Sequence, residues 1–310
     1  MYFPVAGIEV SPWIPPLVAF AISLFTSMGG VSGAFLLVPF QASVLGFHSP
    51  SMSATNHLFN ILAIPSGVWR YRREGRMLWP VVWIVTLGTL PGVLLGVLMR
   101  IHWLADPEAF KLFVGIVLLY IGGQLALELI RKKNIDRHQD AAEEQFWKTA
   151  GAPAAVSIRE FSARRLAYDF CGQSFEMRTL PLALLCLAVG IIGGIYGIGG
   201  GSIIAPLLIA FFGMPVYIAA GAALMATFVT SLAGVTFYQL LAPWYPHLAV
   251  GPDWGLGLLF GLGGMAGMYC GARLQKFVRA RIVKTILAIC ILVPALGYLR
   301  APLRSALPFR

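Results

Sequence analysis

Charged residues are scarce in this chain. They make up 12% of its 310 positions, whereas hydrophobic residues make up 58%. A water-soluble domain carries about 25% charged residues, so the composition excludes an ordinary soluble globule. Apolar stretches long enough to cross roughly 30 Å of hydrocarbon recur from one end to the other. We therefore predict an all-α polytopic membrane protein. The same composition predicts membrane lipid as a partner.

Basic residues are missing from the first part of the chain, although the net charge is +10. No Lys or Arg precedes Arg70, and the later ones fall in short clusters between apolar runs. Such clusters are typical of cytoplasmic loops beside anionic lipid headgroups, and we expect no nucleic-acid partner. The N-terminus also lacks a basic segment followed by a cleavage site, so we predict no removable signal peptide.

The usual signatures of metal, redox or nucleotide chemistry are missing as well. The four cysteines, Cys171, Cys186, Cys270 and Cys290, have neither CxxC nor metal-ligand spacing, and we predict that they serve in packing. The phosphate-binding pattern GxxxxGK[ST] does not occur, which argues against ATP-driven pumping by this chain. We expect no cofactor and no bound metal.

Glycine is plentiful, and its spacing indicates an internal repeat. An offset of 167 places Gly30 on Gly197, Gly33 on Gly200, Pro39 on Pro206, Gly46 on Gly213 and Gly67 on Gly234. Further along, the GxxxGxxxG row of Gly88, Gly92 and Gly96 recurs as Gly263, Gly267 and Gly271. We predict two homologous halves, residues 1–131 and 179–310, and assign the two rows to close helix packing.

A hydrophilic insert, residues 132–178, separates the halves. Its first part, Lys132–Lys148, is polar and compatible with a helix. Its second part alternates apolar and polar residues over positions 156–175, with Gly172 at a turn position. This alternation predicts a small β-hairpin on the cytoplasmic side of the membrane.

Two of the eight apolar segments, 13–46 and 179–212, are too long for one unbroken span, and glycines interrupt each of them. If all eight segments cross, 16 Lys and Arg residues lie inside and 7 outside. If the two broken segments enter and return, the counts are 18 and 5, which suits the positive-inside rule better. The second arrangement leaves three crossings in each half, so we predict two inverted repeats with broken or re-entrant helices.

The glycine breaks are the candidate substrate site. Irregular backbone at membrane depth must face protein or a watery cavity, and a helix that starts there presents free N–H groups and its positive dipole end. Such helix starts bind small anions. From the breaks we select as substrate-binding candidates Gly30, Ser32, Gly33, Gly197, Gly199, Gly200, Gly201 and Ser202.

The segment after the first break adds polar side chains. Asn56 and Asn60 lie four residues apart on one helical face, with His57 beside them, while Thr227 occupies the position of Asn60 in the second half. His57 is the titratable member of this set and a candidate for coupling transport to protons, the alternative being a neutral histidine bound to a neighbouring helix. We expect the first half to supply mainly side chains and the second half mainly backbone donors.

At these residues the chain resembles the TauE/SafE family of sulfite and organosulfonate exporters. The resemblance rests on the doubled glycine break, the helix from Ser53 to Gly67, the GxxxG rows and the central insert. The breaks compared are Gly29-Gly30-x-x-Gly33 followed by Pro39, and Gly197-x-Gly199-Gly200-Gly201 followed by Pro206. The first break departs from the family pattern because Val31 and Ser32 interrupt it. The resemblance implies a bacterial inner-membrane protein that moves small sulfur-containing anions, mostly outward.

Two other functions fit parts of the sequence. Gly30-Val31-Ser32-Gly33 matches the GxSG pattern of intramembrane serine proteases, with His57, His102 or His247 as the base for Ser32. An anion channel or a membrane scaffold is the second alternative. We favour a secondary transporter of a small anion rather than an enzyme, and the sequence leaves a homodimer open.

Overall fold

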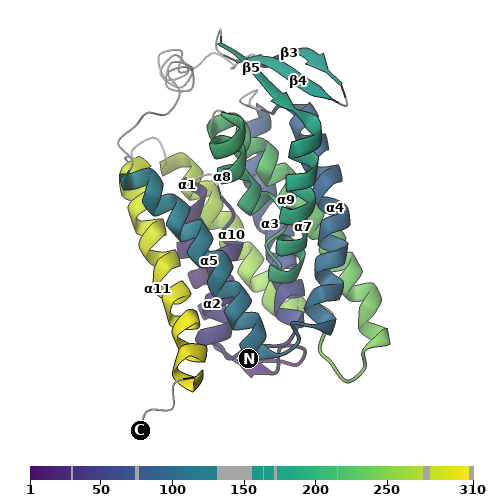
Figure 1. Ribbon diagram of the computed structural model, residues 1–310. Coiled ribbons are helices and arrows are strands. Elements are labelled where there is room, and N and C mark those ends of the chain that lie inside the picture. Colours follow the sequence, from purple (N-terminus) through teal and green to yellow (C-terminus); the bar gives the residue numbers. More distant parts are fainter. Residues whose placement is uncertain are drawn as a thin grey trace.

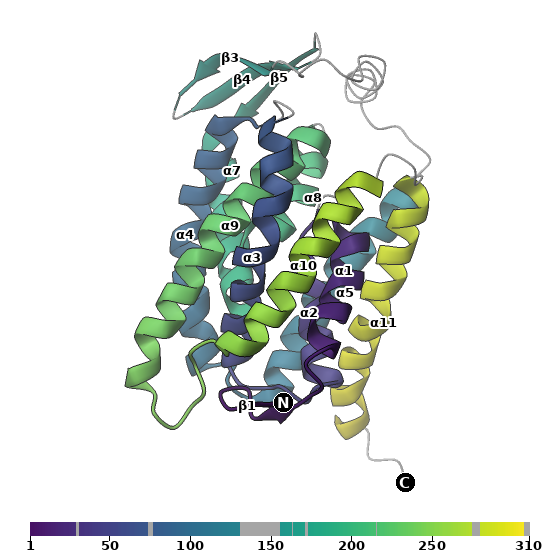
Figure 2. The same ribbon diagram turned by 180° about the vertical axis from the view of Figure 1, so that it is seen from behind.

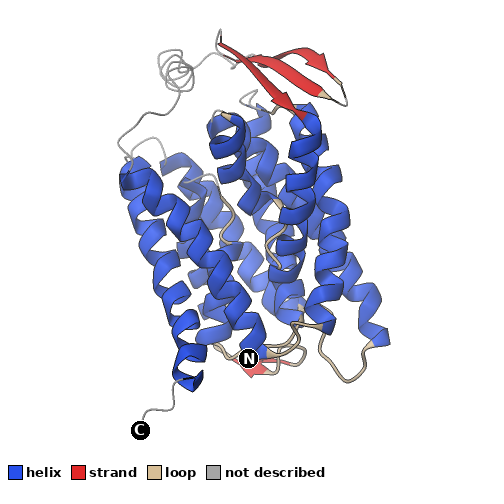
Figure 3. Cartoon of the chain, viewed as in Figure 1, coloured by secondary structure: helices blue, strands red, loops and turns tan. Residues whose placement is uncertain are grey.

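The computed structural model describes residues 1–28, 31–73, 77–130, 156–162, 164–170, 173–214, 216–274 and 280–306. The first half contains the helices α1 (Ile14–Met28), α2 (Ala34–Ser43), α3 (Ser51–Arg73), α4 (Trp79–His102) and α5 (Pro107–Ile130). The second contains α7 (Thr179–Tyr196), α8 (Gly201–Phe212), α9 (Val216–Leu241), α10 (Trp254–Leu274) and α11 (Ala280–Ala306). Figure 1 shows them as one bundle, and Figure 3 shows that strands lie outside it.

Helix length separates the elements that can cross a membrane from those that cannot. Among the described residues, the helices both long and apolar enough to cross are Trp79–His102, Thr179–Tyr196, Ile218–Trp244 and Trp254–Leu274. By contrast α2 has 10 residues and α8 has 12. At 1.5 Å per residue these reach about 15 and 18 Å, roughly half of the hydrocarbon thickness.

The first broken segment enters and returns at the same end of the bundle. A short hairpin of β1 (Tyr2–Phe3) and β2 (Ile8–Glu9) precedes α1, and the Ala6 amide beside it donates to Asp253 Oδ2 at 3.2 Å. At the start of α3, the Ser51 amide donates to the carbonyl of Ala249 at 2.9 Å. Both partners lie in the loop between α9 and α10, so the α1–α2 unit begins and ends at one end of the bundle. This arrangement supports the re-entrant alternative for this segment.

The second broken segment has the same design at the opposite end. A cavity there is lined by Arg178 and Pro181, at the start of α7, together with Phe211 and Phe212, at the end of α8. Figure 1 shows that α3 and α10 end, and α4, α7 and α11 begin, at this end of the bundle, which carries the sheet. The described residues Arg73, Arg178 and Arg273, which belong to the three basic stretches, thus lie toward one end of the bundle.

The two glycine rows are packing surfaces, as predicted. Cβ atoms added at Gly88, Gly92 and Gly96 would meet in turn Ala183, Leu187 and Ile191 of α7. Those added at Gly263, Gly267 and Gly271 would meet Pro16, Phe20 and Leu24 of α1. In both pairs the contacts advance together by four residues, so α4 runs parallel to α7 and α10 runs parallel to α1.

Two further pairs run antiparallel, and each joins helices that the sequence repeat makes equivalent. Along α3 and α9, His57 faces Gly234, Asn60 binds Ser231, and Gly67 faces Leu224. Along α5 and α11, Gly115 faces Tyr298 and Gly122 faces Leu292. Figures 1 and 2 show α3 and α9 side by side in the interior and α5 against α11 at one side.

The insert forms a three-stranded antiparallel sheet rather than a single hairpin. Its strands are β3 (Val156–Phe161), β4 (Arg165–Phe170) and β5 (Gln173–Arg178), in the order β3-β4-β5. The rings of Tyr168 and Phe175 stack across β4 and β5 with centroids 5.3 Å apart. The predicted alternation is confirmed, and the sequence missed that it covers three strands. The predicted polar helix and Gly172 lie outside the described residues.

Exposed tryptophans mark both ends of the bundle. Trp69, Trp79 and Trp83 lie toward the sheet end, and Trp13, Trp103, Trp244 and Trp254 lie toward the opposite end. Tryptophan is enriched at the two membrane–water interfaces because its ring is apolar and its N–H is polar. The two groups therefore fit the boundaries of a bilayer that the helices cross.

The glycine rows give a first prediction. An added Cβ at Gly92 would lie 2.3 Å from the Leu187 carbonyl oxygen, whereas one at Gly123 meets nothing within 4 Å. Gly92→Ala should force α4 and α7 apart and cost about 1–3 kcal/mol. Gly123→Ala, on α5, is the matched control and should leave the melting temperature in detergent unchanged or slightly raised. Equal melting temperatures for the two variants would contradict this packing.

Candidate functional site

One asparagine on α3 joins the two helix breaks. The Asn56 side-chain amide donates to the Ala34 carbonyl, in the first residue of α2, and to the Gly197 carbonyl, in the residue that ends α7. Both distances are 3.0 Å. Gln41 completes the contact by donating to Asn56 Oδ1 at 3.5 Å. Ala34 and Gly197, one from each half of the chain, thus share a single amide group.

A second asparagine repeats the arrangement one turn along α3. The Asn60 amide donates to the Ile198 carbonyl at 3.1 Å and to Ser231 Oγ, on α9, at 3.2 Å. From the first break, Ser32 Oγ donates to Asn60 Oδ1 at 2.5 Å. The predicted residues Ser32, Asn56 and Asn60 are fully buried. The structure thus brings them together with Gly197.

The glycines of the second break are required by its backbone. Gly197 and Gly199 have positive φ angles of 83° and 67°, which side chains disfavour. At Gly201 an added Cβ would lie 1.8 Å from the Ala223 carbonyl oxygen and 2.1 Å from Thr227 Oγ1, and at Gly200 it would lie 2.6 Å from a carbon of Thr89. Glycine here lets α8 begin directly against α9 and α4.

The remaining predicted residues lie around this centre with different partners. The Thr227 hydroxyl donates to the Ala223 carbonyl of its own helix at 2.8 Å. Gly33 lies against α1, where an added Cβ would be 3.1 Å from Ser23 Oγ. Gly30 lies outside the described residues, and for Ser202 the structure describes the backbone, in the first turn of α8, but not the side chain.

His57 is buried between α3 and α9. Its Nδ1 lies 3.3 Å from Ser231 Oγ, and its ring occupies the space left by Gly234. Its Nε2 is buried without a hydrogen-bond partner among the described residues. At the equivalent place in the other half, Leu224 faces Gly67. The two halves therefore differ here by the replacement of a leucine with a histidine.

The division of donors between the halves differs from the expectation. Toward α3, the second break presents the carbonyl oxygens of Gly197 and Ile198, which accept hydrogen bonds from the first half. A break that ends one helix exposes carbonyls as well as starting another helix with free amides, and the sequence argument considered only the second part. In the observed conformation the polar groups largely satisfy one another, away from solvent.

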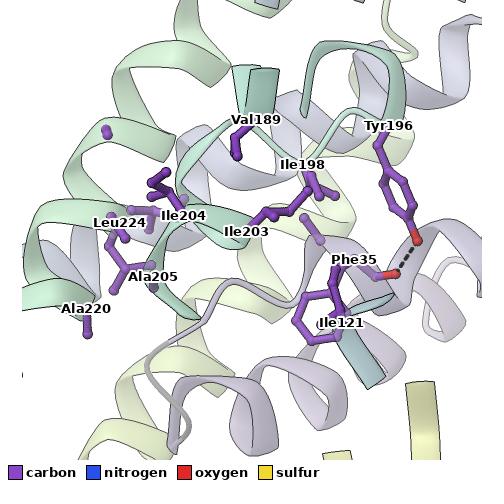
Figure 4. Close-up of a cluster of buried hydrophobic side chains, with 14 of the residues drawn as sticks. Phe35, Ile121, Val189, Tyr196, Ile198, Ile203, Ile204, Ala205, Ala220 and Leu224 are labelled. Atoms are coloured by element: carbon purple, nitrogen blue, oxygen red, sulfur yellow. Dashed lines mark hydrogen bonds between the residues drawn. The ribbon is translucent and has the colours of Figure 1, made fainter. Parts of the chain in front are cut away.

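Apolar side chains enclose the polar centre. Figure 4 shows Ile198, Ile203 and Ile204 beside the second break, with Phe35 of α2 facing it. The Tyr196 hydroxyl donates to the Phe35 carbonyl at 2.8 Å. This shell lowers the local dielectric, and it raises the cost of any hydrogen bond left unmade.

The site residues selected from the sequence leave out four members of the cluster, which are Ser53, Ser231, Tyr196 and Arg100. Ser53 Oγ donates to the Ile195 carbonyl in the last turn of α7, and Ser231 Oγ accepts from the Asn60 amide. The Tyr196 hydroxyl donates to the Phe35 carbonyl on α2. Ser53 Oγ also accepts a hydrogen bond from Arg100 Nε at 3.3 Å. The available signal for Arg100 was its position, a lone arginine at the end of an apolar helix.

The protease alternative finds no support in the geometry. Ser32 Oγ donates to Asn60, and His57 contacts Ser231 on another helix. His102 Nε2 instead lies within hydrogen-bond distance of the Tyr245 hydroxyl, at 3.0 Å. A serine nucleophile needs a base within hydrogen-bond reach, and none of the described contacts of Ser32 is with a histidine.

A polytopic bundle with two broken segments joined at its centre is an arrangement that membrane transporters use. The chain belongs to the family described as "Sulfite exporter TauE/SafE", whose match covers residues 16–298. Members of this family are membrane transporters rather than enzymes, and the assignment supports a multi-pass protein of the bacterial inner membrane.

A curated relative agrees with the family assignment. It is the "Probable membrane transporter protein YunE" of Bacillus subtilis (strain 168), 22% identical over 212 residues. The alignment covers 68% of this chain and 66% of that protein. No solved structure matches the chain.

The asparagine bridge gives a second prediction. Asn56→Leu removes both donors and leaves the Gly197 carbonyl without the side-chain partner that the structure describes, at about 1–3 kcal/mol. We expect a lower melting temperature and loss of transport. Thr230→Val is the matched control, because Thr230 is equally buried but its hydroxyl donates only to carbonyls of its own helix. Transport by Asn56→Leu at the level of the control would contradict the bridge.

Proposed function

We propose that this protein is a secondary transporter that exports a small sulfur-containing anion, sulfite or an organosulfonate, by alternating access. The observation that carries the proposal is the bridge made by Asn56, which holds the breaks of both halves on one side chain. A substrate bound at that point touches both halves at once. Family membership supports the transporter class, and the family description supports the sulfur anion.

Inverted repeats would supply the alternating access. Two lines of evidence support inversion: α3 and α9, equivalent in the repeat, pack antiparallel, and so do α5 and α11. The segment with the first break begins and ends at the end of the bundle opposite the sheet. The segment with the second break begins and ends at the sheet end. Exchange of conformation between two such halves would expose the centre first to one side and then to the other.

The donors for the anion are the side-chain amides of Asn56 and Asn60. In the observed conformation these amides bind carbonyls of the breaks. When the halves separate, the amide hydrogens become free, and an oxyanion can take the place of the carbonyl oxygens. Free N–H groups in the first turns of α2 and α8 add to the attraction.

A flux assay tests this function. Proteoliposomes containing the purified protein should show saturable movement of sulfite, taurine or sulfoacetate, since a carrier must change conformation for each substrate. Empty liposomes and Asn56→Leu are the controls. Flux that rises linearly with concentration would indicate a channel instead. Saturable flux of phosphate or chloride, without any of the sulfur anions, would contradict the substrate class.

His57 is our candidate for proton coupling. A buried imidazolium is costly without a counter-ion, and an anion at Asn56, on the adjacent residue, would supply one. Proton and anion would then bind together. The group that faces His57 across the interface with α9 is the Tyr238 ring, with ring centroids 6.2 Å apart. Ser231 Oγ, also on α9, lies 3.3 Å from His57 Nδ1.

The repeat itself supplies the test variant for His57. His57→Leu copies the residue at the equivalent position 224, where a leucine already packs against a glycine. This variant should fold and move the anion down its gradient, but a proton gradient should no longer accelerate transport. His102→Leu, at an exposed position, should behave as the wild type. Unchanged proton dependence in His57→Leu would exclude this residue from coupling.

A further inference from the structure

Arg100 is a buried cation that the proposed transport site does not use. Its side chain lies near the end of α4 and is fully buried. Its guanidinium donates to Ser53 Oγ at 3.3 Å, to the His48 carbonyl at 3.1 Å and to the Leu104 carbonyl. The Phe110 ring covers it, with the guanidinium carbon 3.8 Å from the ring centroid.

The charge of Arg100 has no carboxylate partner among the described residues. The ion pairs that the structure describes join Arg159 to Asp169 and Arg165 to Glu176, both in the sheet. Buried charges are normally paired, because desolvation of an isolated ion is expensive. Carbonyl oxygens and an aromatic face compensate only part of that cost. None of the described ion pairs includes Arg100, so its charge is left to carbonyl oxygens, a hydroxyl and an aromatic face.

The surroundings of Arg100 are suited to an oxyanion. It lies at the N-terminal end of α3, where the helix dipole is positive. Ser51, the first residue of α3, is fully buried, and its Oγ has no hydrogen-bond partner. The hydroxyl of Ser49, two residues earlier, is also buried and without a partner. Arg100 thus lies beside the start of α3, and this start and the loop before it carry two hydroxyls without a described hydrogen-bond partner.

This place is connected to the centre of the protein through Ser53. Ser53 Oγ donates to the Ile195 carbonyl, in the last turn of α7, at 2.9 Å. Asn56 lies one turn further along α3, and Gly197 packs on the Ser53 backbone. The carbonyl partners of Arg100, at His48 and Leu104, belong instead to the loops that close the bundle at the end opposite the sheet.

We propose that Arg100 forms a second anion site, between the central breaks and the end of the protein opposite the sheet. It takes a small oxyanion of the sulfite or sulfonate class, and in that choice of ligand it rests on the proposed function. The basic loops assign the sheet end to the cytoplasm, so this site faces the exit. When the halves open toward the exit, Arg100 releases the loop carbonyls and binds the anion in their place.

The test measures anion binding rather than transport alone. Sulfite affinity of the purified protein is determined by calorimetry and by thermal stabilisation. Arg100→Met should weaken sulfite binding at least about tenfold, because a charge-assisted hydrogen bond is lost. Arg100→Lys keeps the charge but not the planar fork or its stacking on Phe110, so it should bind sulfite more weakly than the wild type and more tightly than the neutral variants. Arg100→Gln is the second neutral variant: it can still donate to the loop carbonyls, so it tests the charge if Arg100→Met fails to fold.

The control variant is Arg273→Met. Arg273 lies in the last turn of α10, the helix equivalent to α4, and its guanidinium carbon lies 4.7 Å from the Tyr269 ring centroid. It is exposed at the sheet end, so its loss should leave sulfite affinity unchanged. If the neutral variants of Arg100 bind sulfite like the wild type, even with a lower melting temperature, Arg100 is structural and the inference is overturned. If the wild type binds none of the sulfur anions, the proposed function fails first.

Discussion

Backbone groups exposed by a break in a membrane helix must find partners inside the protein, because hydrocarbon offers none. In this protein α3 supplies many of them. Asn56 and Asn60 donate to carbonyls on both sides of the bundle centre, and Ser53 binds a third carbonyl at the end of α7. The rest of the fold can be understood as the means of holding α3 beside both breaks.

Glycine packing provides that means. The rows on α4 and α10 allow these helices to approach α7 and α1 until backbone touches backbone. Each pair combines a helix from one half with a helix from the other, so the two halves interlock rather than sit side by side. In lipid, where the hydrophobic effect does not drive helices together, such close contact is the main source of association. It fixes the re-entrant units at the depth where α3 can bind them.

The two halves have similar packing contacts at equivalent positions, but they differ in the polar side chains there. Gly234 and Gly67 occupy equivalent places on α9 and α3, yet one faces His57 and the other faces Leu224. Likewise the amide of Asn60 corresponds to the hydroxyl of Thr227, which turns back to its own helix. Shape must be conserved in both halves for the bundle to close. The polar groups are free to differ, and most of the buried ones at the centre lie in the first half.

The sequence alone determined the class of protein, the repeat, the packing role of the glycine rows and most residues of the centre. These features are local: a scarcity of charge, a fixed spacing of glycines, and two asparagines on one helical face. Tertiary structure decided what the asparagines touch, that the second break offers carbonyls, and that the insert forms three strands. It also revealed Arg100, since a lone arginine near a helix end is unremarkable in sequence. Its lack of a carboxylate partner among the described residues appears only when the helices around it are assembled, because burial and pairing are properties of neighbours distant in the chain.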